Sequence, residues 1–233
     1  MTLTLSSREA FAQGGNRLCF VHPQHSDRCI KVRRPDFTLE DLRRKKGFPK
    51  SLLPLRHFDD NLEEFHVLSH LARRHGEVVF ELVSRCYGFE ETDLGPGLTL
   101  ELIRDADGQI SQTLKAQLWF EGYTPDCQAA VQHFCARWRA LQIPSRDLLL
   151  HNLLVQKDAS GSVCRILAID GLGSPNIIPF TWLPAPLRVA KVERKLTNLQ
   201  QRIDQLLAKK ARGEDPGYHG MATAHHIHEN SKG

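Results

Sequence analysis

Two short stretches decide how this chain is interpreted: Ser145-Arg146-Asp147-Leu148-Leu149-Leu150-His151-Asn152, and Ile169-Asp170-Gly171. Asp147 lies five residues before Asn152, and Asp170 follows an apolar run 18 residues after Asn152. Phosphoryl transfer spreads negative charge over the phosphoryl oxygens, and the Mg²⁺ that neutralises this charge binds carboxylate and amide oxygens. We therefore predict that Asn152 and Asp170 bind Mg²⁺, and that Asp147 orients or deprotonates the attacking hydroxyl as a base.

An isolated lysine lies in a short apolar run far upstream of these stretches. The run covers residues 28–32 and predicts a strand on which Lys31 holds its ammonium against nucleotide phosphates. Residues 11–20, just before it, predict a strand, a glycine turn and a returning strand, which is the layout of a loop over phosphates. We expect Gly14 of this turn to contact the nucleotide.

A helix is predicted over residues 61–71. Its apolar positions recur every three residues: Leu62, Phe65, Leu68 and Leu71. Glu64 lies on this helix, where its carboxylate can pair with Lys31. Such a pair would fix the lysine in place.

Two further strands and a turn are predicted before the central stretch. The strands cover residues 78–83 and 97–103, and residues 104–108 form the turn that closes the sheet. We interpret this turn as a hinge between two lobes. The backbone of Glu101, Leu102 and Ile103 would then bond the edge of an adenine.

Loop, lysine, glutamate, aspartate, asparagine and aspartate follow one another here in the order found in protein kinases. The chain resembles the small kinase-like bacterial proteins of the PhoP regulatory network protein YrbL family, over roughly residues 3 to 200. The segments that carry the resemblance are residues 19–23, 28–31, 64–74, 152–154 and 170–171. It implies an ATP-binding, two-lobed kinase-like fold linked to bacterial envelope signalling, without a known substrate.

The chain departs from the full protein-kinase pattern at several positions. Ala12 begins the loop where a glycine triad would start, so a methyl group replaces one position of close phosphate approach. Ser145 stands where most kinases have His, and Leu149 stands where a Lys neutralises the transferred phosphate. Transfer should therefore be slow or should use another cation. No Ala-Pro-Glu segment follows Asp170, so we do not expect a long groove for a protein substrate.

We predict an α+β, protein-kinase-like two-lobed fold with a β-rich N-lobe and a reduced helical C-lobe. The N-lobe covers residues 1–103 and carries a basic insertion at 33–57, which its arginines, lysines and prolines predict to be extended and solvated. The C-lobe covers residues 104–212 and ends in an amphipathic helix. Residues 213–233 are predicted to be a disordered tail.

Two helices are predicted in the C-lobe. The first covers residues 126–141, with one apolar face: Ala130, Phe134, Trp138 and Leu141. The second carries a stripe at alternating spacings of three and four: Val189, Val192, Leu196, Leu199, Ile203 and Leu206. Basic residues flank this stripe: Lys191, Arg194, Lys195, Arg202 and Lys209. A helix packed on its own lobe is favoured over a coiled-coil surface for a partner, because the stripe lasts under three heptads.

Composition is typical of an intracellular globular protein of 233 residues, with 41% hydrophobic residues. No apolar run approaches the length of a membrane-spanning helix, and the N-terminus lacks the features of a signal peptide, so we expect a cytoplasmic protein without a membrane contact. The six cysteines form no Cys-x-x-Cys pair and predict reduced thiols. Four histidines of the tail, His219, His225, His226 and His228, predict only adventitious metal binding.

ATP- and Mg²⁺-dependent transfer of phosphate to an unknown acceptor is the favoured function. The alternative is a nucleotide-sensing pseudokinase that acts by binding a regulatory protein partner. A weaker alternative is a scaffold that binds nucleic acid or an acidic partner through residues 33–56. Nucleic acid is disfavoured because only Phe37 and Phe48 of this segment could stack on bases and the net charge is only +4.

Overall fold

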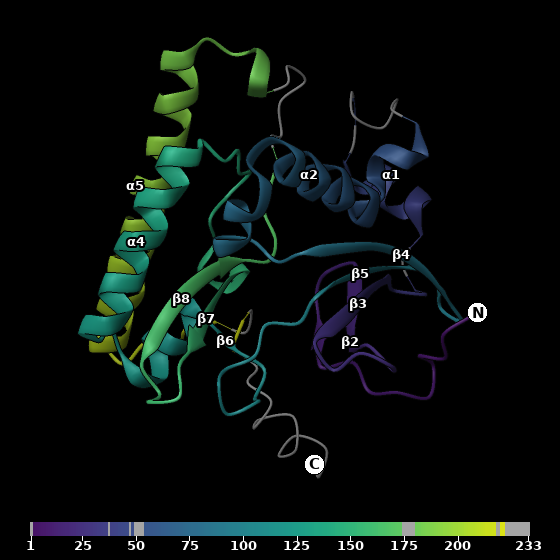
Figure 1. The fold of residues 1–233 in the computed structure, drawn as a ribbon, viewed down its shortest axis with the longest axis horizontal. Coiled ribbons are helices and arrows are strands. Elements are labelled where there is room, and N and C mark those ends of the chain that lie inside the picture. Colours follow the sequence, from purple (N-terminus) through teal and green to yellow (C-terminus); the bar gives the residue numbers. More distant parts are fainter. Residues whose placement is uncertain are drawn as a thin grey trace. The chain divides into compact units, whose positions relative to one another are not determined.

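The computed structural model of this chain divides into two compact units (Figure 1). The N-terminal unit comprises Met1–His70 and Arg85–Leu102, and the C-terminal unit comprises Leu71–Ser84 and Ile103–Gly233. The structure describes residues 2–36, 38–46, 48, 54–173, 180–217 and 220–221. The first unit is rich in β-sheet and the second is mainly helical, so the fold is mixed α+β, as predicted.

A five-stranded antiparallel sheet forms the N-terminal unit, in the order β1-β2-β3-β5-β4. Its strands are β1 (Ala12–Gln13), β2 (Arg17–Val21), β3 (Arg28–Arg33), β4 (Cys86–Thr92) and β5 (Gly95–Glu101). Ile30 and Val32 of β3 are fully buried in a cluster with Leu5 and Phe20. Because side chains alternate along a strand, Lys31 points to the opposite face of the sheet. The strand-turn-strand predicted around Gly14 is confirmed by the pairing of β1 with β2.

Helix α2 (Asp60–His75) confirms the helix predicted around Glu64. The Asp59 carboxylate caps it by accepting hydrogen bonds from the backbone N–H groups of Asn61 and Leu62, at 3.0 and 3.1 Å. Its buried stripe contains Asn61, Glu64, Leu68 and Leu71, whereas the Leu62 and Phe65 side chains are only partly buried. The buried face is therefore rotated from the predicted one, and it carries two polar side chains.

Two predicted segments have a different structure from the one expected. Residues 39–46 of the basic insertion form helix α1 (Leu39–Lys46), followed by the short η2 (Leu55–Phe58). Thr38 and Asp41 cap α1 reciprocally, a signal that the basic composition obscured. Residues 78–83 were predicted as a strand, but η3 (Gly76–Glu81) is a 3₁₀ helix. A short apolar run does not distinguish a buried helical turn from a strand.

The C-terminal unit contains a three-stranded antiparallel sheet in the order β6-β7-β8. The strands are β6 (Gln112–Thr113), β7 (Leu153–Lys157) and β8 (Val163–Ala168). Around them lie α3 (Leu114–Ala116), the π-helical turn η4 (Gln117–Glu121), α4 (Pro125–Leu141), η5 (Leu150–Asn152), η6 (Phe180–Trp182) and α5 (Ala185–Ala211). Helix α4 packs on β8 and beside α5, and buries Phe134 and Trp138 as predicted (Figure 1).

Helix α5 carries the C-terminal apolar stripe and packs on its own lobe, as favoured over a coiled-coil surface for a partner. Its buried side chains are Val192, Leu196, Leu199, Ile203 and Leu206. Val189, at the start of the stripe, is 44% exposed. The apolar stripe is therefore used within the C-terminal unit rather than as a free partner surface.

Part of the predicted tail makes hydrogen bonds within the C-terminal unit. Lys115 Nζ donates to the Gly217 carbonyl at 2.7 Å, and Thr113 Oγ1 donates to the Gly220 carbonyl at 2.6 Å. The tail histidines His219, His225, His226 and His228 lie outside the described residues, as does Phe37.

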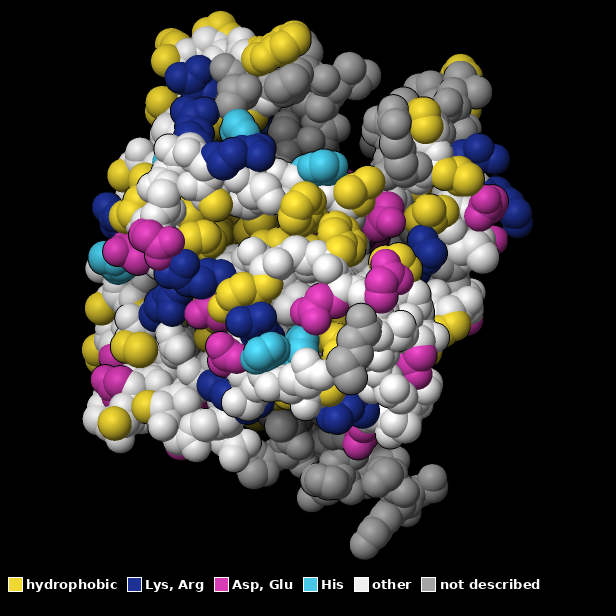
Figure 2. Space-filling model, turned by 45° about the vertical axis from the view of Figure 1, so that its right-hand side comes forward, with side chains coloured by type: hydrophobic (Ala, Val, Ile, Leu, Met, Phe, Trp, Pro, Cys, Tyr) yellow, Lys and Arg dark blue, Asp and Glu magenta, His cyan; other side chains and the backbone are white. Residues whose placement is uncertain are grey.

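None of the six cysteines, all of which lie in the described ranges, forms a disulfide. Within the described ranges, no helix is both long and apolar enough to cross a membrane. On the face drawn in Figure 2, Lys and Arg side chains are interspersed with Asp and Glu side chains.

Candidate functional site

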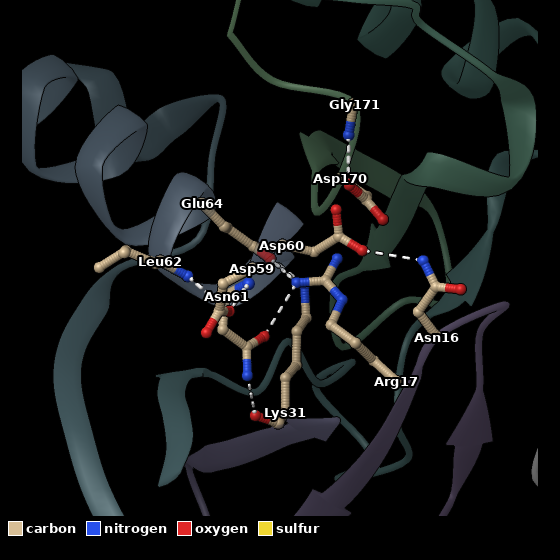
Figure 3. A network of polar contacts seen from close by, with 10 residues as sticks. All are labelled: Asn16, Arg17, Lys31, Asp59, Asp60, Asn61, Leu62, Glu64, Asp170 and Gly171. Atoms are coloured by element: carbon tan, nitrogen blue, oxygen red, sulfur yellow. Dashed lines mark hydrogen bonds and ion pairs between the residues drawn. The ribbon is translucent and has the colours of Figure 1, made fainter. Parts of the chain in front are cut away.

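A buried ion pair joins β3 to α2 in the N-terminal unit (Figure 3). Lys31 Nζ donates a hydrogen bond to Glu64 Oε1 at 2.7 Å, and the two side chains are only 8% and 7% exposed. The strand alternation that buries Ile30 in the apolar cluster directs Lys31 to this opposite face. The structure thus brings together the lysine and the glutamate that the sequence predicted to pair.

Arg17 is a second cation that contacts Glu64, and the sequence analysis did not predict this contact. It donates to Glu64 Oε2 through Nη1, and the same atom lies 3.2 Å from Asn61 Oδ1 (Figure 3). Asn61 Nδ2 in turn donates to the Lys31 carbonyl at 2.8 Å. The register of β2 on β3, with Cys19 opposite Lys31, puts Arg17 on the lysine's face and was the available signal.

These contacts fix the first turns of α2 to the sheet. Asn16, next to Arg17, adds a hydrogen bond from its Nδ2 to Asp60 Oδ2 at 2.9 Å. Removing one partner of a buried ion pair typically costs about 3–5 kcal/mol, because the other charge is left without compensation. The position of Glu64 is therefore set by the fold itself.

The turn between β1 and β2 carries the predicted nucleotide contact Gly14. Its backbone N–H donates to the Arg17 carbonyl at 2.8 Å. A Cβ at Gly14 would meet only that carbonyl, at 3.7 Å, and a Cβ at Gly15 would meet no atom within 4 Å. Neither glycine is required by a positive φ angle. Packing in this unit therefore gives no reason for glycine here, whereas the close approach of a ligand would.

The predicted adenine contacts lie where the two units meet in the sequence. Glu101 and Leu102 end the N-terminal unit, and Ile103 begins the second stretch of the C-terminal unit. The N–H of Glu101 donates to the Arg85 carbonyl and that of Leu102 to the Asp27 carbonyl, both at 2.9 Å. An adenine bound here would have to use other backbone groups of this segment or exchange these bonds.

A cysteine thiol also contacts this segment. Burial raises the pKa of Cys29 to about 12, so its thiol stays protonated at neutral pH. The thiol donates weakly to the Glu101 carbonyl, with a sulfur–oxygen distance of 3.9 Å. Cys29 is therefore a structural donor here and not a reactive thiolate.

The second group of predicted residues lies in the C-terminal unit, on two segments that are joined through their backbones. The Arg146 N–H donates to the Gly171 carbonyl at 2.8 Å, and the Ile169 N–H donates to the Asn152 carbonyl at 2.9 Å. Gly171 has a φ of +74°, and a Cβ there would lie 2.4 Å from the Asp147 carbonyl oxygen. Only glycine lets these segments approach so closely.

Asn152 and Asp170 have the donor chemistry that Mg²⁺ prefers. Asp170 is exposed, and its Oδ1 accepts the N–H of Gly171 at 2.6 Å. Asn152 is partly buried, and its Nδ2 lies 3.1 Å from where a Cβ on Gly171 would be. Among the residues with described positions, no group of three or more His, Cys, Asp or Glu is arranged to hold a metal. One carboxylate and one amide fit Mg²⁺, which usually keeps waters and substrate phosphates as its remaining ligands.

Asp147 is paired with two cations of α5 that the sequence reading did not connect to it. Arg202 Nη2 donates to Asp147 Oδ2 at 2.8 Å, and Lys195 Nζ lies 3.8 Å from Asp147 Oδ1. Lys195 also donates to the Arg146 carbonyl. The two cations are seven residues apart, so they lie on one face of the helix. Both flank the apolar stripe in the sequence, but nothing local indicates their shared partner, which lies 55 residues before Arg202.

This protein is of a two-unit α+β class, with a buried lysine–glutamate pair on its sheet and an aspartate paired with two cations in its helical unit. The chain belongs to the family described as PhoP regulatory network protein YrbL, whose model matches residues 3–204. It is 27% identical over 186 residues to the "Uncharacterized protein YrbL" of Escherichia coli (strain K12), covering 77% of this chain and 78% of that protein. The protein of the same name from Shigella flexneri matches to the same extent. The family predicted from the sequence is thereby confirmed.

Proposed function

We propose that this protein has a protein-kinase-like two-lobed fold, binds ATP with Mg²⁺ and transfers the terminal phosphoryl group to an acceptor within a PhoP-linked regulatory network. The observation that carries this proposal is the buried pair between Lys31 and Glu64. A buried ion pair is often no more stabilising than apolar residues of similar size. Its presence on a sheet face is better explained by a need to hold an ammonium in a fixed position. This activity requires the cytoplasm, where ATP is available.

The roles in the N-terminal unit follow from charge and backbone access. Lys31 binds nucleotide phosphates, and Glu64 fixes the lysine. Gly14 allows the phosphates to approach the backbone, which its lack of a packing role supports. The backbone of residues 101–103 bonds the adenine.

The roles in the C-terminal unit follow from oxygen donors and a base. Asn152 and Asp170 hold Mg²⁺, which when bound neutralises charge on the phosphate oxygens. Asp147 takes the proton of the acceptor hydroxyl as the hydroxyl oxygen bonds to the γ-phosphorus. The bond between this phosphorus and the β–γ bridging oxygen breaks, and ADP leaves with the electron pair.

A pseudokinase that senses nucleotide and binds a regulatory partner is the second candidate. The hydrogen bond from Arg202 to Asp147 favours it, because the guanidinium occupies a carboxylate oxygen that a general base would use to take the proton. The sequence also lacks a lysine at Leu149 and an Ala-Pro-Glu segment after Asp170. Both candidates share the nucleotide site, so nucleotide binding is tested first.

ATP should stabilise the protein against heat only when Mg²⁺ is present. At an ATP concentration about 100 times Kd, one-site binding adds about 2.7 kcal/mol to the free energy of unfolding. Lys31→Ala and Asp170→Ala should each abolish the rise in melting temperature. Arg33→Ala is the matched control, because Arg33 lies two residues along the same strand and is exposed. A parent protein that ignores ATP and Mg²⁺ together would refute the nucleotide site.

Asp147→Asn separates an enzyme from a pseudokinase. In an enzyme this variant should keep its ATP affinity and lose about two to four orders of magnitude in autophosphorylation or turnover, the usual contribution of a general base. The measurement is transfer from radiolabelled ATP, with affinity by calorimetry. ATP binding by the parent without transfer, unchanged by the substitution, would favour the sensor.

A further inference from the structure

Three polar atoms around Asp147 are buried without a hydrogen-bond partner among the residues that the structure describes. They are Asp147 Oδ1, Arg202 Nη1 and Ser145 Oγ. Buried polar atoms are nearly always paired, and an unpaired one calls for an explanation such as a ligand or a catalytic role. Here the unpaired set contains an acceptor on the carboxylate and a donor on the guanidinium of one ion pair.

The guanidinium of Arg202 can bind two groups at once. It has five N–H donors in a planar fork, and Nη2 is already used on Asp147 Oδ2 at 2.8 Å. The Asp147 and Arg202 side chains are 34% and 28% exposed, so the ion pair borders on solvent. An anion at Nη1 and a hydroxyl at Asp147 Oδ1 would pair both atoms.

An anion bound to Arg202 would be neutralised by a positive charge that the sequence lacks at the usual position. Leu149 occupies the position where the kinase pattern has a lysine for the transferred phosphate. Arg202 and Lys195 bring positive charge to Asp147 from α5. A guanidinium suits a phosphate because its fork matches two phosphate oxygens.

We infer that Arg202 is the residue that binds the transferring phosphoryl group beside Asp147, in place of the missing lysine. Lys195 is a positioning residue, since it holds the loop through the Arg146 carbonyl. The inference rests on the proposed function, because it assigns a further role at the same phosphotransfer site. It makes α5 part of that site.

The test compares the affinities of ATP and ADP, both with Mg²⁺, in Arg202→Gln. If Arg202 binds the terminal phosphate, this substitution should weaken the affinity for ATP about tenfold and change the affinity for ADP by less than about twofold. Arg202→Lys keeps one cation and should lose less ATP affinity than Arg202→Gln. Arg194→Gln is the control, because Arg194 is exposed on the same helix and should leave both affinities unchanged.

The possible results separate this inference from the proposed function. A parent protein that binds no nucleotide overturns both. If the parent protein binds nucleotide and the binding depends on Lys31, the proposed nucleotide site stands. The inference alone is then overturned if Arg202→Gln weakens ATP and ADP binding equally, or weakens neither. Faster transfer in Arg202→Gln would also overturn it, because the arginine would then restrain Asp147. The melting temperature without nucleotide shows whether the variant is folded, and Arg202→Lys provides the comparison if Arg202→Gln is not.

Discussion

The two groups of predicted residues differ in how their positions are fixed. Lys31 and Glu64 contact each other, are buried, and belong to neighbouring elements of one unit. Asp147 and Asp170 lie on loops, are partly or fully exposed, and depend on Gly171 and on α5 for their surroundings. A site built on a strand and a helix is held by the core, whereas a loop site needs dedicated contacts.

This difference explains which supporting residues escaped the sequence reading. Arg17 supports the first group from an adjacent strand, and a correct strand register would have revealed it. Arg202 supports the second group from a helix distant in sequence. The first support follows from local pairing rules, but the second follows only from tertiary structure.

The largest effect on stability is expected when the buried pair of Lys31 and Glu64 is broken. Glu64→Ala leaves Lys31 and Arg17 buried beside an absent partner, so we expect the free energy of unfolding to fall by about 3–5 kcal/mol. Urea denaturation measures this loss. Glu40→Ala, at an exposed position of α1, should cost less than about 0.5 kcal/mol. A Glu64 loss as small as that of Glu40 would show that the pair does not fix α2.

A smaller effect is expected at the turn that holds the loop site together. Gly171→Ala should cost at least about 2 kcal/mol, because a side chain at its φ of +74° is strained and also meets the Asp147 carbonyl oxygen. Gly161→Ala is matched, since Gly161 has a φ of +79° but open space around it. It should cost only about 1 kcal/mol. Equal losses in urea denaturation would mean that the close approach of the two segments contributes nothing.

The apolar periodicity of the sequence predicted the long helices, whereas the basic composition of residues 33–57 led to a wrong prediction for α1. Helices α2, α4 and α5 were expected because their apolar residues recur at helical spacing. Even so, the buried face of α2 includes Asn61 and Glu64, since polar partners on the sheet compensate them. Helix α1 was missed because its basic run was read as solvated, although Thr38 and Asp41 form a capping pair. Loop contacts such as that of Arg202 carry no local signal.

The smallest effect concerns the basic helix α1, which lies in the segment that the weaker alternative makes a scaffold for nucleic acid or an acidic partner. Arg43 and Arg44 are exposed there. Several contacts already fix α2 to the sheet, among them the Lys31–Glu64 pair and the bond from Asn61 to the Lys31 carbonyl. Helix α2 therefore has little freedom to move in response to the charges on α1. We expect the removal of these charges to change ATP affinity by less than about threefold.

The variant replaces Arg43, Arg44, Lys45 and Lys46 with Gln, because this segment is helical and Gln keeps a helix propensity close to that of Arg and Lys. Calorimetry with ATP and Mg²⁺ measures its affinity, and a melting curve checks its fold. A change of an order of magnitude would show that α1 controls α2 despite the fixed Glu64. Nucleic-acid binding at physiological salt that weakens steeply as salt rises, and that this variant loses, would instead make α1 a phosphate-backbone surface. The scaffold alternative would then be favoured, because the charges of α1 would bind a ligand of their own rather than influence the position of Glu64.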